Sequence, residues 1–159
     1  MDSISTPAIE ELRARQIPHR VFQHPGPVTS LEQAAAERSQ QPEQVVRSIV
    51  FRLSEDDFIM VLMAGPGQVP WKFLRRFTGQ SRLTMATEEE LLRVTGCVPG
   101  TVSPFGLPQP MRVLVESRIL DQEEVSLGSG VRGLAVIMDP REMVKAIPGV
   151  EVITIDGAN

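Results

Sequence analysis

Residues 95–106, with the sequence TGCVPGTVSPFG, restrict the fold of this chain more than any other stretch of it. Glycine occupies positions 96, 100 and 106, and proline occupies positions 99 and 104. Glycine permits positive φ angles and close backbone approach, whereas proline fixes φ and removes a hydrogen-bond donor. Alternating the two specifies a rigid loop whose remaining N–H groups can bind an anion or a developing oxyanion. A structural crossover with tight turns is the simpler interpretation.

The length of 159 residues and the ordinary composition indicate one domain, residues 1–159, that can bury a normal core. No apolar run approaches the roughly 18 residues that span a bilayer, and the first residues lack the apolar core of a signal peptide. The single cysteine fits a reducing compartment, so we expect a cytoplasmic protein without a membrane partner. The net charge of −4 argues against strong non-specific binding of nucleic acid, but a local basic face can still guide an RNA end.

Apolar patterning, caps and breakers predict a mixture of helices and strands. Capping boxes at residues 29–32 and 87–90 predict two helix starts, and Gly96 predicts the end of the second helix. Further helices are expected from Pro7, Pro70 and Asp139, and a second glycine loop is expected over residues 126–133. Strands are expected over residues 20–23, 46–53, 58–64, 111–116, 134–138 and 151–155. This order predicts a mixed α/β fold with a largely antiparallel, curved or partly closed sheet surrounded by helices.

No common catalytic motif is present. The chain lacks the motifs of zinc proteases, disulfide oxidoreductases, α/β-hydrolases and P-loop proteins. His19 and His24 flank one short strand, and with a single cysteine they do not suggest a zinc site, so we expect no metal and no cofactor. Each histidine is, more simply, a surface or loop-anchoring residue. Cys97 is either a nucleophile or a small buried side chain, and no obvious base accompanies it.

Two groups of cations are candidates for binding. Lys72, Arg75 and Arg76 share one helix face, and with nearby Arg82 they form either a phosphate-binding surface or a solvated face. Arg47 stands inside an otherwise apolar strand, where a charge needs a partner or a ligand. It is a site residue if its face opens to a cleft, and a strand-end arginine reaching solvent if it does not.

Four segments, in this order, resemble one known family. They are HPGPVTSLEQAAAE, VVRSIVFRL, TGCVPGTVSPFG and SGVRGLAVIMDPREMV. These stretches are similar to the YbaK/ProX family of aminoacyl-tRNA deacylases, the free-standing relatives of the editing domain inserted in bacterial prolyl-tRNA synthetases. The resemblance implies a strongly bent, barrel-like sheet and hydrolysis of a mischarged aminoacyl-tRNA ester. It also implies the 3′ end of an aminoacyl-tRNA, and prolyl-tRNA synthetase, as partners.

The resemblance assigns site residues by position. Gly100 and Pro104 take the positions of a Gly-x-x-x-Pro element whose backbone lines the reacting carbonyl, and Arg47 falls where most members carry lysine. The substrate-binding positions that it implies are Phe22, His24, Thr29, Ser48, Thr101, Val102, Ser103, Ser129 and Gly130.

Three hypotheses follow. The first is a trans-editing deacylase that removes Cys or Ala from a proline tRNA. The second is a non-catalytic module that binds an aminoacyl or adenosine end, because Arg47 replaces the usual lysine. The third is a thiol hydrolase that uses Cys97. The sequence leaves the oligomeric state open.

Overall fold

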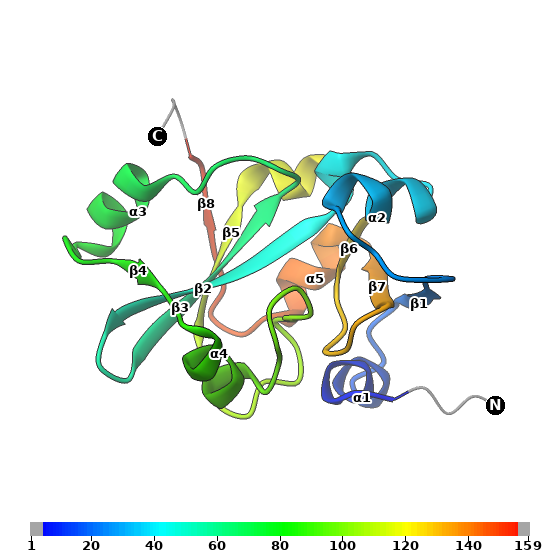
Figure 1. Ribbon diagram of the computed structural model, residues 1–159, viewed down its shortest axis with the longest axis horizontal. Coiled ribbons are helices and arrows are strands. Elements are labelled where there is room, and N and C mark those ends of the chain that lie inside the picture. The colour runs from blue at the N-terminus through cyan, green and yellow to red at the C-terminus, as the bar shows by residue number, and fades with distance from the viewer. Residues whose placement is uncertain (1–4, 156–159) are drawn as a thin grey trace.

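The computed structural model describes residues 5–155, which form helices and strands in the mixed order that the sequence predicts (Figure 1). The helices are α1 (Pro7–Ala14), α2 (Leu31–Glu37), α3 (Trp71–Thr78), α4 (Glu88–Thr95) and α5 (Pro140–Ala146), with 3₁₀ turns η1 (Pro42–Gln44) and η2 (Ser117–Asp121). The strands are β1 (Arg20–Gln23), β2 (Val46–Ser54), β3 (Asp57–Ala64), β4 (Thr84–Met85), β5 (Arg112–Glu116), β6 (Val125–Gly128), β7 (Leu134–Met138) and β8 (Glu151–Ile153). The mixed α/β class is therefore confirmed. No helix among the described residues is long and apolar enough to cross a membrane.

The strands form two sheets that do not close into a barrel. The larger sheet has the order β4-β2-β3-β5-β8, and the smaller has the order β1-β7-β6. Strand β5 pairs in parallel with β3 and β8, and the other pairs are antiparallel. An isolated bridge between Val45 and Ser126 joins the sheets. Figure 1 shows the smaller sheet beside the start of β2, between α2 and α1.

Strand β2 is a central strand, as its sequence predicts, but it is less buried than expected, because only Val46, Val50 and Phe51 are buried. It lies between β4 and β3, and it contributes to apolar cores on both of its faces. Val46 and Val50 belong to the larger core, which contains residues of both sheets, whereas Phe51 belongs to the core under α3. Neighbouring residues of a strand point to opposite faces. Ser48 therefore shares the face of Val46 and Val50, and Arg47 shares the face of Phe51.

One of the two predicted capping boxes is confirmed. The Thr87 side chain accepts a hydrogen bond from the Glu90 N–H, and the Glu90 carboxylate accepts one from the Thr87 N–H. The box predicted at residues 29–32 is wrong, because α2 begins one residue later than the pattern indicates. Ser30 is its N-cap and accepts a hydrogen bond from the Gln33 N–H.

The predicted glycine loop at residues 126–133 is wrong in its first part, because those residues belong to β6. A Cβ atom at Gly128 would lie 2.3 Å from the carbonyl oxygen of Val102. This glycine therefore marks a close backbone approach inside a strand, and not a turn. The two-residue strand β4, which pairs with β2, was also absent from the sequence-based prediction.

Candidate active site

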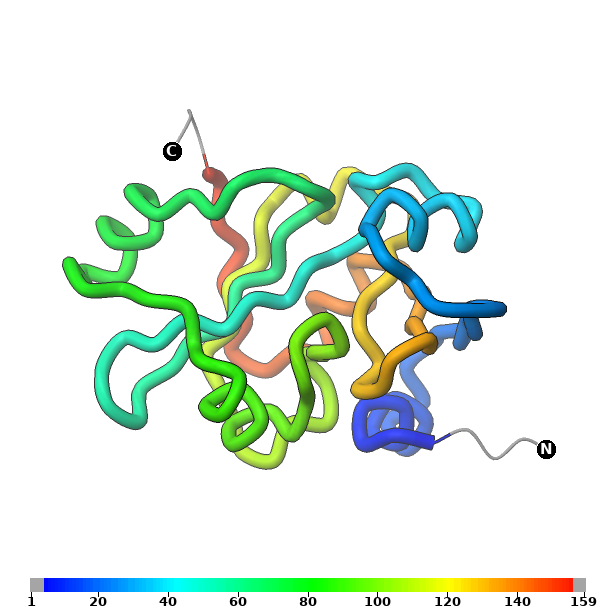
Figure 2. Tube along the Cα trace, viewed as in Figure 1, coloured from blue at the N-terminus to red at the C-terminus, as the bar shows by residue number. Residues whose placement is uncertain are grey.

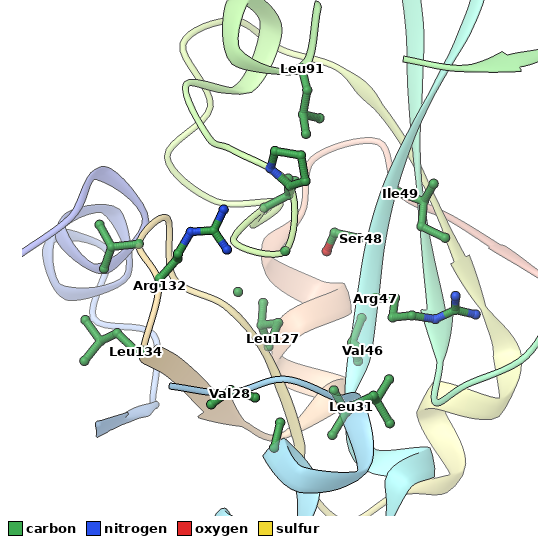
Figure 3. Close-up of a pocket in the computed structure, with 18 of the residues that line it drawn as sticks. Val28, Leu31, Val46, Arg47, Ser48, Ile49, Leu91, Leu127, Arg132 and Leu134 are labelled. Atoms are coloured by element: carbon green, nitrogen blue, oxygen red, sulfur yellow. The ribbon is translucent and has the colours of Figure 1, made fainter. Parts of the chain in front are cut away.

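Residues from both sheets line a cavity of about 530 Å³ (Figure 3). Its walls come from β2, α2 and the segment before it, the β4–α4 segment, the glycine-proline loop, and β6 with the connection to β7. The lining is mainly apolar, and includes Val28, Leu31, Val46, Leu91 and Leu127. An apolar cavity with a few placed polar groups is the usual form of a small-molecule site. The polar groups of the wall therefore determine what this cavity can bind.

Gly100 lies in a tight turn formed by residues 98–101. The N–H of Thr101 donates to the carbonyl oxygen of Val98 at 3.2 Å, and the Thr101 hydroxyl donates to the same oxygen at 2.8 Å. Pro99 and Gly100 occupy the two central positions, and the φ of +86° at Gly100 fits a type II turn. Gly100 lines the cavity, and its N–H donates to no acceptor within residues 5–155. The turn therefore places a free backbone donor at the cavity wall.

Strand β6 and the residues after it hold this loop from behind. Gly128 approaches so closely that a Cβ atom there would lie 2.3 Å from the Val102 carbonyl oxygen and 2.6 Å from that of Thr101. Two residues further on, the N–H of Gly130 donates to the Thr101 carbonyl at 2.8 Å. The two contacts tie the turn to β6, so the position of Gly100 depends on the smaller sheet. Figure 2 shows residues 96–110 doubling back between α4 and the β6–β7 connection.

Helix α1 fixes the far end of the same loop. The N–H of Gly106 donates to the Glu11 carboxylate at 2.6 Å. Gly106 has a φ of +72°, and a Cβ atom at this position would lie 2.4 Å from the backbone of Pro7 and Ala8. The Thr6 hydroxyl, at the N-cap of α1, donates to the carbonyl of Ser129. Helix α1 is therefore attached to the loop and to the end of β6 together.

Ser48 and Arg47 are neighbours on β2 with different surroundings. The Ser48 hydroxyl is buried and has no hydrogen-bond partner within residues 5–155, and Ser48 lines the cavity. The Arg47 guanidinium donates to the carbonyls of Gly65 and Gly67, each at 2.8 Å. Figure 3 shows its side chain directed away from Ser48. Partial burial lowers the pKa of Arg47 from its ordinary value, but an arginine remains charged at neutral pH.

A chain of hydrogen bonds around His24 fixes another part of the wall. His24 Nε2 accepts a hydrogen bond from Arg38 Nε at 3.0 Å, and His24 Nδ1 lies 2.6 Å from the Glu37 carboxylate. Because an arginine Nε–H can only donate, His24 Nε2 is the acceptor, and Nδ1 is the ring nitrogen that faces the carboxylate. Arg38 also donates to the Ser126 hydroxyl at 2.8 Å, and that hydroxyl donates to Gln40 at 2.7 Å. In this network, both ring nitrogens of His24 have partners.

Arg38 is a half-buried cation of the cavity wall. It lines the cavity, and two of its five N–H groups donate hydrogen bonds to His24 and Ser126. Burial lowers the pKa of Arg38, although the guanidinium stays charged at neutral pH. Hydrogen bonds from Gln33 and His24 hold the pKa of the Glu37 carboxyl below its ordinary value. Glu37 and Arg38 therefore place opposite charges beside the two ring nitrogens of His24.

Two further charged residues lie at the rim. Arg132 and Glu88 are exposed, line the cavity and have no ion-pair partner in the described part of the chain. Figure 3 shows the Arg132 side chain extending from the β6–β7 connection toward the space in front of the glycine-proline loop. Within residues 5–155, no three His, Cys, Asp or Glu side chains are grouped so that they could hold a metal ion.

The aminoacyl-tRNA editing domain is the family whose model matches this chain, over residues 25–146. The chain belongs to this family. The matched region of the editing domain contains β2 with Ser48, the glycine-proline loop, and β6 with Arg132. All walls of the cavity except His24 thus come from the part of the chain that matches the family.

Curated relatives and solved structures agree with this assignment. A proline–tRNA ligase of Trichlorobacter lovleyi is 29% identical over 84 residues, which are 53% of this chain and 15% of the ligase. A proline–tRNA ligase of Streptococcus thermophilus is 26% identical over 104 residues, which are 65% of this chain and 17% of the ligase. The editing domain thus spans less than a fifth of these ligases. A crystal structure of a proposed trans-editing enzyme for prolyl tRNA synthetase has the same fold, with a TM-score of 0.84 and 24% identity, covering 98% of this chain and 100% of that one.

The editing-domain cavity brings together only part of the predicted site. The predicted residues that line it are His24, Arg47, Ser48, Gly100 and Val102. The predicted residues outside its lining are Phe22, Thr29, Thr101, Ser103, Pro104, Ser129 and Gly130. Several of the latter support the site from behind. Ser129 donates to the Leu134 carbonyl, Thr29 donates to Gln33, and the ring of Phe22 meets that of His24 edge-on at 4.9 Å.

Sequence reasoning did not identify Arg38, Arg132 or Glu88 as lining residues of the editing domain. Arg38 follows the last residue of α2, where a cation is an ordinary partner for the helix dipole, so its sequence gives no sign of a site. Arg132 lies within a quoted motif of the resemblance but was not assigned a role. Cys97 is buried beside the larger core and is absent from the cavity lining, which fits the small buried side chain among its two interpretations.

Proposed function

We propose that this editing domain hydrolyses the ester of a mischarged aminoacyl-tRNA, acting in trans as a deacylase. The proposal rests on two polar groups in the wall of one mainly apolar cavity. The Gly100 N–H and the Ser48 hydroxyl have no hydrogen-bond partner within residues 5–155. A buried polar group without a partner is destabilising, so such groups are expected where a ligand supplies the missing hydrogen bond. An ester offers acceptors for both groups.

The reaction needs little from side chains. A water oxygen forms a bond to the ester carbonyl carbon, and the C–O bond to the terminal ribose then breaks. The proton of the water goes to the departing ribose oxygen, which gives a free amino acid and an uncharged tRNA. In the tetrahedral intermediate the carbonyl oxygen is an anion, and the Gly100 N–H is the donor that we assign to it. One donor of this kind contributes roughly 3 kcal/mol to the transition state.

A histidine base is not part of this proposal. His24 Nε2 already accepts a hydrogen bond from Arg38, and Nδ1 bonds Glu37, so neither ring nitrogen is available to a water molecule. A neighbouring hydroxyl of the terminal ribose, or a second water, instead relays the proton from the attacking water to the departing ribose oxygen. Arg38 and Arg132 then supply positive charge at the wall and the rim, where phosphate and carbonyl oxygens of the RNA end would arrive.

For the substrate, we propose Cys or Ala on a proline tRNA. The apolar walls fit a small uncharged side chain, and the curated relatives are proline–tRNA ligases. The test is release of amino acid from proline tRNA charged with Cys, Ala, Ser or Pro. Release of one non-cognate amino acid well above spontaneous hydrolysis is the expected result. No release from any of the four by a folded protein would contradict it.

The loop mechanism is tested by Gly100→Pro, which removes the N–H assigned to the oxyanion and also forces φ at this position from +86° to about −65°. We expect at least a hundredfold loss of deacylation, in line with a lost oxyanion donor. Gly149→Pro is the matched control, because it imposes a similar change of backbone conformation at a glycine with a φ of +66° that lies away from the cavity lining and has open space around it. Full activity in Gly100→Pro would overturn the loop mechanism, and thermal unfolding of both variants checks that they fold.

The non-catalytic binding module is the second candidate, and Arg47 is the residue that favours it. Its guanidinium is occupied by the carbonyls of Gly65 and Gly67, so no free cation of β2 faces the cavity. Under this hypothesis, the wild type binds an aminoacyl-adenosine analogue without turnover, and Arg47→Lys gains hydrolysis. Under the deacylase proposal, Arg47→Lys changes the rate less than threefold. Cys97→Ser keeps full activity under the deacylase proposal and loses it only in a thiol hydrolase.

A further inference from the structure

The charges of this chain are unevenly distributed along the sequence. Residues 58–87 contain four cations and no aspartate or glutamate. Because the whole chain carries a net charge of −4 and this segment carries +4, the remaining residues carry −8. A positive segment on an otherwise acidic protein gives a directional field, which attracts a polyanion to one side and repels it from the others.

The four cations are exposed and have no acidic partner. They are Lys72, Arg75 and Arg76 on α3, and Arg82 in the turn that follows. None of them forms an ion pair or a side-chain hydrogen bond with any residue in the range 5–155. Most other arginines of the described region are paired, as Arg52 is with Glu90 and Arg112 with Glu151. The α3 face thus keeps its charge available for a partner.

The segment after α3 leads to the cavity. Arg82 and Thr84 line a shallow hollow together with Arg52, whereas Met85, Ala86 and Glu88 line the cavity itself. Strand β4 is the edge strand of the larger sheet, and Figure 1 shows it between α3 and α4. At about 3.3 Å per strand residue, Arg82 lies roughly 10 Å along the chain from Met85. Arg82 therefore lies within a few residues of the rim, whereas the other three cations lie on the helix that covers the opposite face of the larger sheet, so the RNA strand passes around the edge strand β4.

We propose that Lys72, Arg75, Arg76 and Arg82 bind the phosphates of the RNA strand whose 3′ end enters the cavity. The inference rests on the proposed function and adds the surface that holds the body of the substrate. Guanidinium groups match phosphate oxygens in a two-point geometry, and phosphate contacts position a nucleic acid without reading its sequence. Half-exposed Met85, at the edge between this surface and the cavity, offers an apolar face to an unstacked base.

The neighbouring acidic residues limit where the strand can lie. Glu90 is engaged by Arg52 and by the Thr87 N–H, and Glu88 and Glu89 stand at the start of α4. Phosphates are repelled from the start of α4, so the strand stays on the α3 side of β4 until its terminal residue turns into the cavity. The same glutamates suit the α-ammonium group of an aminoacyl ester, which carries the opposite charge.

The test compares two substrates and two matched variants. The substrates are the aminoacyl-tRNA that gives turnover and the corresponding aminoacyl-adenosine, which lacks the RNA body. The first variant combines Lys72→Gln with Arg76→Gln, and the control combines Arg141→Gln with Lys145→Gln on α5, two exposed cations that do not line the cavity. We expect the α3 variant to raise KM for the tRNA roughly tenfold and to leave hydrolysis of aminoacyl-adenosine unchanged. The α5 variant changes neither value by more than twofold.

A binding measurement separates this proposal from the proposed function. Anisotropy of a labelled, uncharged tRNA acceptor hairpin is titrated with wild type and both variants over a range of salt concentrations. The slope of log affinity against log salt falls by about 1.4 in the α3 variant, because two phosphate contacts at about 0.7 each are lost. This result supports the surface even if no ester is hydrolysed. Equal slopes for the α3 variant and the wild type, or binding of an acidic peptide in place of RNA, would overturn it.

Discussion

Ser48 on β2 and Ser126 on β6 both carry buried hydroxyls, and their hydrogen-bonding states are opposite. The Ser126 hydroxyl accepts from Arg38 and donates to Gln40, and the residue is fully buried. The Ser48 hydroxyl has no partner within the described residues, and it belongs to the cavity lining. A network in which every polar group has a partner holds a wall rigid. A buried hydroxyl without a partner lowers the stability of the folded protein until a ligand binds to it. The difference separates the supporting side of the site from the side that has polar groups free for a ligand.

The same contrast holds for the two walls as a whole. Around His24, each polar group is bonded to its neighbours, so this wall is complete without substrate. Along the glycine-proline loop, the Gly100 N–H is free while the carbonyl of Thr101 is tied to Gly130. The loop thus uses the carbonyls of Val98 and Thr101 in hydrogen bonds within the protein and leaves the Gly100 N–H for a ligand. A site that stabilises a developing oxyanion needs this arrangement, because hydrogen-bond donors must face the oxyanion and carbonyl oxygens must not.

Among the variants that test this contrast between the walls, the largest expected effect comes from separating the loop from the scaffold that supports it. Gly128→Ala would place a Cβ atom 2.3 Å from the Val102 carbonyl oxygen, and backbone atoms cannot rotate away as a side chain can. We expect about 1–3 kcal/mol of lost stability and at least a tenfold loss of deacylation, because the turn at Gly100 must shift. Urea unfolding and initial rates measure both. Gly26→Ala is the control, since a Cβ atom there meets nothing within 4 Å. A Gly128→Ala enzyme with wild-type rates would show that the loop position is not set by β6.

The second effect tests the two serines against each other. Ser126→Ala leaves Arg38 and Gln40 without their shared partner, so we expect a loss of roughly 1–3 kcal/mol in unfolding free energy. Ser48→Ala removes an unpartnered buried hydroxyl, so we expect no loss, or a gain of up to about 1 kcal/mol. Deacylation by Ser48→Ala nevertheless falls about tenfold, because the ester loses a hydrogen bond. Equal destabilisation by the two substitutions would mean that the Ser48 hydroxyl has a structural role.

The sequence predicted the side of the site formed by the glycine-proline loop and β2 better than the side that supports it. The glycine-proline loop and β2 are recognisable because their glycines, prolines and apolar alternation are local features. The supporting side depends on contacts between distant segments. From the sequence alone, Gly128 is typical of a turn and Arg38 of a helix end. The structure shows instead that Gly128 packs against the Val102 backbone and that Arg38 donates a hydrogen bond to His24. Local rules also placed the start of α2 one residue early, because Thr29 and Ser30 are both good caps.

The smallest effect concerns the pH dependence of the supporting wall. Hydrogen bonds from Gln33 and His24 lower the pKa of Glu37 in the folded state. The ionised Glu37 carboxylate therefore makes its full contribution to the stability of the fold at pH values above 4.5, the ordinary pKa of this group. This contribution is lost as the pH falls through the folded-state pKa, below that value. Glu37→Gln removes this ionisation, so the variant is less stable than wild type at pH 7, and the difference shrinks as the pH falls from about 5 toward 3. Urea unfolding at several pH values measures it, with Glu32→Gln on the same helix as control. If the difference in unfolding free energy between the variant and wild type stays constant with pH, the network depends on the shape of Glu37 and not on its charge. The hydrogen bond between Arg38 and His24 then forms without the carboxylate.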